Sequence, residues 1–116
     1  MSEVASDQSS VISYQLAQSY PNPFSANETF SNPSTMINFS LPAQSKVMVS
    51  IYNETGQLVR TLVDNEMTNG QHSVRWNGRN QSGRAVAAGI YFYKMVAQNA
   101  AGDVVFAATK RMTLVK

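Results

Sequence analysis

The sequence predicts an all-β sandwich, and the stretch around its single tryptophan gives the main reasons. One segment with alternating apolar residues ends at Trp76, and a second begins with Tyr91. A polar connection with several glycines lies between them. Alternation with a period of two on both sides of turn residues is typical of half-buried antiparallel strands.

Turn chemistry supports this interpretation of the connection. Asn77-Gly78 and Gly83 supply residue types that adopt the positive φ angles of tight turns, and Gly89 permits a close bend into the next strand. We therefore expect a strand, an ordered loop and a strand, with Trp76 buried where the loop begins.

Length and composition predict one folded domain. The chain has 116 residues, of which we assign 1–13 to a flexible linker and 14–116 to the domain. There is no cysteine for a disulfide framework, and the net charge of +2 is too thinly spread for a nucleic-acid interface. No apolar run is long enough for a transmembrane segment, and the N-terminus lacks the features of a signal peptide. If the protein is exported, the chain is either a fragment of a longer protein or a chain without its leader, and we favour the fragment.

The first expected strand, residues 14–19, leads into Tyr20-Pro21-Asn22-Pro23-Phe24. Proline fixes its own φ and favours extended geometry in the residue before it, so this motif should form a rigid extended corner. We expect Tyr20 and Phe24 to attach the corner to the body of the domain.

Alternating segments separated by turn residues predict the remaining strands. They are residues 35–41, 46–53, 58–63, 71–76, 90–98 and 104–116. Val47, Val49 and Ile51 should face inward, and Ser50 should face outward. The strand at 58–63 is less regular and is expected at an edge. About seven short antiparallel strands in a chain of this length are typical of an immunoglobulin-like or fibronectin III-like sandwich.

Catalytic, cofactor and metal sites are not predicted. His72 is the single histidine and alternates with core residues, so we place it at the rim of the sandwich. The carboxylates are dispersed, and no pair has a spacing suited to acid–base catalysis. Residues 77–83 resemble a calcium loop superficially, but they include no carboxylate and one arginine, with a second following at Arg84. Asparagine side chains bonded to the backbone explain this loop better.

Several motifs, in this order, resemble one family. Tyr20-Pro21-Asn22-Pro23-Phe24 opens the set, and Trp76-Asn77-Gly78 with Gly83 and the Gly89-Ile90-Tyr91 stretch continues it. The closing motif is Lys110, Arg111, Met112, Thr113, Leu114, Val115 and Lys116. The set is similar to the C-terminal sorting domain of proteins exported by the type IX (Por) secretion system of Bacteroidetes-like bacteria. It is also similar to the related immunoglobulin-like domain of the flagellar hook-cap (FlgD-like) protein.

The resemblance implies a non-catalytic module that directs export and surface attachment of a larger protein. Its implied partners are the outer-membrane secretion and sorting machinery and an upstream cargo domain of the same polypeptide. The implied location is the periplasm in transit and then the cell surface or the medium. The closing motif at residues 110–116 would carry the recognition signal. The chain departs from the family pattern by an insertion at residues 25–31 and by Asn77 and Asn80 where many relatives have aspartates.

Two other functions fit the same sequence. One is a carbohydrate-binding accessory module with a polysaccharide as its partner, for which Tyr52, Phe92 and Phe30 are the candidate exposed aromatics. The other is a structural assembly domain of the hook-cap type.

Overall fold

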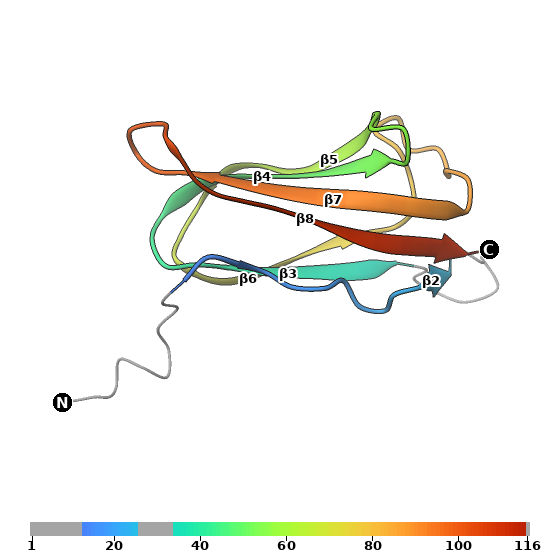
Figure 1. Ribbon diagram of the computed structural model, residues 1–116, viewed down its shortest axis with the longest axis horizontal. Helices are drawn as coiled ribbons and strands as arrows, with labels where there is room; N and C mark the ends of the chain where they lie inside the picture. The colour runs from blue at the N-terminus through green and yellow to red at the C-terminus, as the bar shows by residue number, and fades with distance from the viewer. Residues whose placement is uncertain (1–12, 26–33, 116) are drawn as a thin grey trace.

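The computed structural model describes residues 13–25 and 34–115, and within these ranges it contains eight strands and no helix. Figure 1 shows two facing sheets. The smaller sheet has the order β1-β3-β6, with β1 at Gln15–Leu16, β3 at Thr35–Leu41 and β6 at Gly70–Trp76. The larger sheet has the order β2-β8-β7-β4-β5. Its strands are β2 at Phe24–Ser25, β8 at Val104–Val115, β7 at Gly89–Gln98, β4 at Ser45–Asn53 and β5 at Leu58–Met67.

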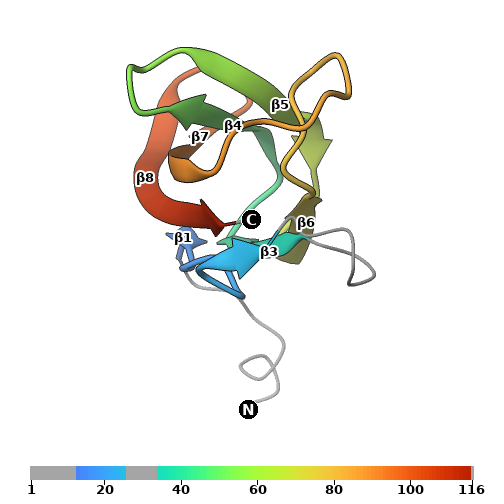
Figure 2. The same ribbon diagram turned by 90° about the vertical axis from the view of Figure 1, so that its right-hand side faces the viewer.

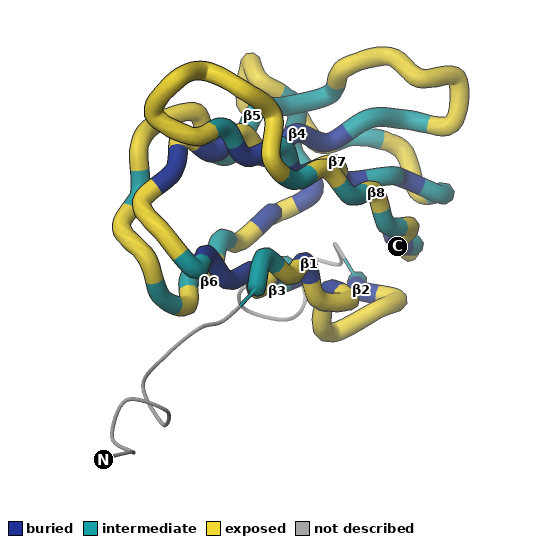
Figure 3. Tube along the Cα trace, turned by 60° about the vertical axis from the view of Figure 1, so that its left-hand side comes forward, coloured by how far each residue is buried: buried dark blue, intermediate teal, exposed yellow. Residues whose placement is uncertain are grey.

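The core lies between the two sheets, as the end view in Figure 2 and the burial pattern in Figure 3 show. Strand alternation decides which side chains enter it. Fully buried residues include Ile37 on β3, Val49 and Ile51 on β4, and Tyr93 on β7. Trp76 is also fully buried, at the end of β6. The predicted all-β sandwich and its main core residues are confirmed.

The N-terminal segment differs from the prediction. Regular pairing covers only Gln15–Leu16, followed by an isolated bridge between Tyr20 and Met36. Residues 21–23 form a bend with cis Tyr20-Pro21 and Asn22-Pro23 bonds, so the expected extended corner is wrong. The physical reason is topological, since β1 belongs to the smaller sheet and β2 to the larger one, and the chain must cross between them here.

Of the two aromatic residues expected to hold this segment, one does so with its side chain. Phe24 is buried, whereas the Tyr20 side chain is 77% exposed, and Tyr20 attaches the segment only through its two backbone bonds to Met36. Hydrophobicity alone could not distinguish them, because the direction of each side chain depends on where the chain crosses between the sheets.

Two strand details also differ. β5 continues to Met67, beyond the predicted end at residue 63, and it does lie at an edge of its sheet. Ser50 is buried although it has the outward position in the alternation. It lies in a central strand, opposite Lys94 on one side and Thr61 on the other, and the register with β5 shifts between Val49 and Ser50.

Some expectations lie outside the described residues. These are most of the linker at 1–13, most of the insertion at 25–31, Phe30 and Lys116. The division into a linker and a domain at residue 14 stays a prediction. Within the described ranges, no helix is long and apolar enough to cross a membrane.

Candidate functional site at the end of the C-terminal strand

The loop after Trp76 is ordered by hydrogen bonds. The indole Nε1–H donates to the Arg79 carbonyl over 2.9 Å, and the Val86 N–H donates to the Gly78 carbonyl over 3.0 Å. Gly78 is buried and has a φ of 76°, which explains the need for glycine there. Asn77, by contrast, is exposed.

Asn80 organises the centre of this loop. Its Oδ1 accepts from the N–H of Ser82 (3.1 Å), the hydroxyl of Ser82 (2.9 Å) and the N–H of Arg84 (3.0 Å). Gly83 follows with a φ of 87°, and its carbonyl accepts from Arg79. A cation in this loop would need the Asn80 Oδ1 as a ligand, and that oxygen already accepts three hydrogen bonds. Among the described residues there is also no group of three His, Asp or Glu side chains that could hold a metal ion.

The same turn occurs three times in the part of the chain that the structure describes, and sequence reasoning missed this repetition. In each case an asparagine Oδ1 accepts from the backbone N–H groups two and four residues later, and a glycine with positive φ stands in the fourth position. The turns are residues 53–57, 80–84 and 99–103. The signal was available as asparagine followed three residues later by glycine.

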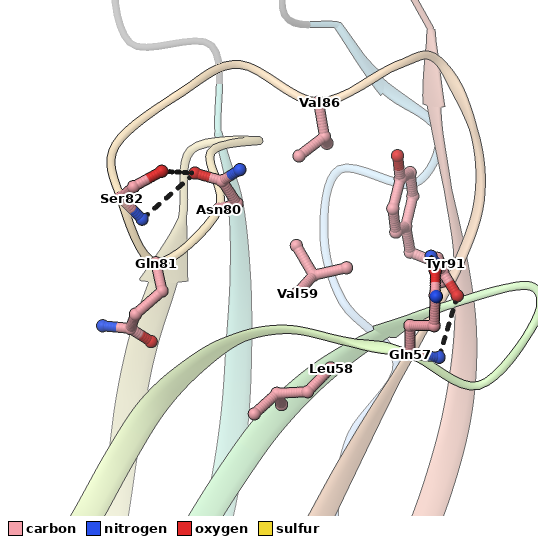
Figure 4. Close-up of a pocket in the computed structure, with 9 residues that line it drawn as sticks. Gln57, Leu58, Val59, Asn80, Gln81, Ser82, Val86 and Tyr91 are labelled. Atoms are coloured by element: carbon pink, nitrogen blue, oxygen red, sulfur yellow. Dashed lines mark hydrogen bonds between the residues drawn. The ribbon is translucent and has the colours of Figure 1, made fainter.

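The turns at residues 53–57 and 80–84 lie at the same end of the molecule. They border an open groove of about 560 Å³ (Figure 4). The Gln81 N–H donates to the Val59 carbonyl, and the Gln81 side chain accepts from the Thr61 N–H. The lining is amide and hydroxyl groups with a few apolar side chains, including Tyr91. The groove offers hydrogen bonds to a polar ligand but no nucleophile or titratable pair.

His72 lies elsewhere, at the rim of the sandwich as predicted. Its ring stacks on Phe39 with 5.5 Å between centroids, and its Nε2 lies 2.8 Å from the Thr68 carbonyl oxygen. This position gives the imidazole a structural partner on each side.

The opening and closing motifs of the sequence meet at the end of β8. β2 runs parallel to β8, with Phe24 opposite Leu114. The Asn22 Oδ1 accepts the Thr113 N–H over 2.9 Å, and the Gln18 side chain donates to the Arg111 carbonyl over 2.8 Å. Residues 18–25, which we call the strap, therefore bond to the edge of β8 that faces away from β7, from residue 111 onward.

Aromatic packing fixes the strap to the loop region. Phe24 contacts Trp76 edge-on with 5.5 Å between ring centroids, and Trp76 contacts Tyr91 in the same way at 5.2 Å. Gly89, with a φ of 152°, opens β7 two residues before Tyr91. Phe24, Trp76 and Tyr91 thus form one aromatic cluster that joins the strap to the loop region, whereas Tyr20, Asn77 and Gly83 are exposed.

Tyr93 holds the start of the strap. Its hydroxyl accepts the Ser19 N–H over 2.8 Å and donates to the Ala17 carbonyl over 2.7 Å. Burial raises the pKa of Tyr93, and the bonds to Ser19 offset part of that rise. The phenol consequently stays protonated at neutral pH and keeps its donor.

The closing motif divides into buried and accessible residues. Met112 and Leu114 are buried in the core, whereas Arg111 and Val115 are exposed and Thr113 is half-buried. Lys110 is half-buried on the core-facing side of β8, opposite Tyr93. The contiguous set proposed for recognition is therefore not one surface. The exposed part of the strap, Tyr20, Pro21, Asn22 and Pro23, lies beside its accessible members.

Comparisons with known proteins agree with this fold. The sequence matches the FlgD Ig-like domain family over residues 25–105, a stretch that ends before the closing motif. A comparison with curated proteins by sequence gives no match.

Similar solved structures include the FlgD proteins of two bacteria. The FlgD of P. aeruginosa has 20% identity and a TM-score of 0.60 over 90% of this chain and 78% of that one. The FlgD of Xanthomonas campestris has 21% identity and a TM-score of 0.57 over 89% of this chain and 67% of that one. Latent PorU of Porphyromonas gingivalis has 20% identity and a TM-score of 0.66 over 90% of this chain, which spans 10% of the PorU chain. The family match covers more than half of the sequence, so the chain belongs to the FlgD Ig-like domain family.

Proposed function

We propose that this chain is a non-catalytic module that directs the export and surface attachment of a longer bacterial protein through the type IX secretion system. Its partners would be the outer-membrane sorting machinery and a cargo domain earlier in the same polypeptide. It would pass through the periplasm and end at the cell surface or in the medium.

The observation that carries this proposal is the meeting of the two terminal motifs. Both the Tyr20–Phe24 motif and the closing motif resemble the sorting family, and both lie outside the stretch matched to the FlgD Ig-like family. In the fold they are joined by the bonds from Asn22 and Gln18 to β8. A pair of separate motifs that forms one surface is what a folded recognition signal requires.

Burial indicates which atoms a partner could read. Met112 and Leu114 serve the core, so the signal would consist of Arg111, Val115 and the exposed face of the strap. Export would then depend on a folded domain and not on an extended C-terminal tail.

The test uses a reporter with its own signal peptide, fused to the domain in a host with the type IX apparatus. We expect the wild-type fusion to reach the surface or the medium. Arg111→Ser should leave the reporter in the periplasm with the domain still folded, because surface substitutions usually change stability by less than about 0.5 kcal/mol. Lys94→Ser is the matched control, since Lys94 is an exposed cation on the neighbouring strand and lies outside the motif.

Unchanged export of the Arg111 variant would remove Arg111 from the signal. Retention of the wild-type fusion in the periplasm would contradict the sorting function itself.

A second candidate function rests on a pair of aromatic residues. Tyr52 and Phe92 are directly opposite each other on β4 and β7, both half-buried on the outward face of the larger sheet. Leu58 and Arg111 continue the same row on the neighbouring strands. Adjacent rings on a sheet face could stack on sugar rings, and this arrangement favours a carbohydrate-binding module over scattered surface aromatics.

Titration against a panel of polysaccharides tests the second function. If the second function holds, one polysaccharide binds saturably, and either Tyr52→Ala or Phe92→Ala abolishes that binding. Tyr20→Ala is the control and should leave the binding unchanged, because Tyr20 is an exposed aromatic residue that is not part of the row. We expect no saturable binding if the domain serves sorting alone. A hook-cap type of assembly role is the remaining alternative, and the protein sequence upstream of Met1 would distinguish it.

A further inference from the structure

The strap leaves most of the outer edge of β8 unpaired. β2 pairs with β8 only at Leu114 and Val115, and the strap's side-chain bonds begin at Arg111. In the described part of the chain, no other strand pairs with β8 on that side. With respect to the described residues, 104–110 therefore form a strand edge without a partner strand, next to the covered part of β8.

The strap contacts reveal which backbone groups point out from this edge. The Arg111 C=O and the Thr113 N–H bond to strap side chains and so point away from β7. In an antiparallel pair, outward-pointing residues alternate with residues bonded to the partner strand. Ala107 and Thr109 follow the same alternation, and no bond to their outward groups occurs among the described residues.

The free segment lacks the features that usually block edge pairing. Residues 104–109 are Val, Val, Phe, Ala, Ala and Thr, without a charge or a proline. Val104 and Val105 are 57% and 42% exposed, two of the six large apolar residues that are exposed in the described structure. The pairing of β8 with β7 has one bulge, at residues 104–106, at the beginning of the segment. Residues 107–109 pair with β7 in regular register.

We propose that a second copy of this chain pairs with this edge, with β8 antiparallel to β8 of its partner across a two-fold axis at Ala107. The two larger sheets would then form one continuous sheet. This self-association is independent of the proposed role in export.

The register follows from the residues on the edge. Pairing Ala107 with its counterpart places Thr109 opposite Val105 and Lys110 opposite Val104, so no like charges meet. Ala107 is exposed and small, which allows close approach at the axis. A register centred on Thr109 would instead place Ala107 opposite Arg111, whose carbonyl is already bonded to Gln18. A symmetric contact that uses one surface of both copies also closes at the dimer.

Covalent trapping tests this register. The chain has no cysteine, so Ala107→Cys introduces a single thiol at the proposed axis. Facing Cα atoms in a hydrogen-bonded antiparallel pair lie about 5.5 Å apart, within the range of about 4.4–6.8 Å that a disulfide spans. Under mild oxidation we expect Ala107→Cys to form a cross-linked dimer and the control Ala101→Cys, exposed in the adjoining turn, to stay largely monomeric. Equal cross-linking of the two variants would overturn the proposal.

Sedimentation of the full chain gives a second test without a new thiol. We expect the mass to rise with concentration from 12.7 kDa toward twice that value. Thr109→Pro removes an outward N–H that the β7 ladder does not use, so it should keep the fold and abolish the rise. Thr109→Ala keeps that N–H and should behave as the wild type. A monomer at every concentration, or a dimer that Thr109→Pro leaves intact, would overturn the proposal.

Discussion

Replacement of Trp76 by alanine is expected to destabilise the domain by about 3–5 kcal/mol, the usual cost of emptying a large aromatic core site. The side chain is fully buried, and it contacts both Phe24 and Tyr91 edge-on. It also donates to the Arg79 carbonyl, which fixes the start of the following loop. A domain of this size has only ~5–15 kcal/mol of stability, so the loss is a large fraction of the total.

Thermal unfolding measures this effect. At a few degrees per kcal/mol, the midpoint should fall by roughly 10–20 °C. Trp76→Phe keeps an aromatic ring in the core and loses the indole N–H, so its midpoint should lie between those of the alanine variant and the wild type. A midpoint for Trp76→Ala close to the wild-type value would exclude Trp76 from the core.

Strand positions and core faces were predictable where alternation is regular. In β3 and β4 the inward set is apolar at every second residue, Ile37 to Leu41 and Val47 to Ile51, and a shift of one residue would reverse the face, so alternation favours one arrangement. Ser40 and Ser50 are exceptions, because each is buried at an outward position in a strand that has a partner strand on both sides.

The strap could not be predicted in the same way. Its bond from Thr113 to Asn22 joins residues 91 apart in the sequence, and no local pattern encodes such a contact. The closing motif was recognisable as a contiguous string, but a strand alternates its faces. Resemblance to a family identified the string. Its alternation predicts that Met112 and Leu114 face inward, and the fold confirms that both are buried, whereas Arg111 is exposed.

Phe24→Ala is expected to have an effect as large as that at Trp76, about 3–5 kcal/mol, because it also empties an aromatic core site. Phe24 is 2% exposed, packs against Trp76 and lies opposite Leu114 where β2 pairs with β8. Its loss removes the apolar anchor of the strap, so the bond from Thr113 to Asn22 should open more often. We expect a lower melting midpoint together with faster hydrogen exchange at the Thr113 amide.

Tyr20→Ala is the matched control, since it removes an aromatic ring from the same motif at a side chain that is 77% exposed. Exposed substitutions usually change stability by less than about 0.5 kcal/mol, so both the midpoint and the Thr113 exchange rate should stay near the wild-type values. The comparison separates anchoring by Phe24 from a general effect of the proline-containing bend. Equal losses in the two variants would mean that the bend itself holds the strap, and a Phe24 variant with normal Thr113 protection would mean that Asn22 and Gln18 hold it without the aromatic anchor.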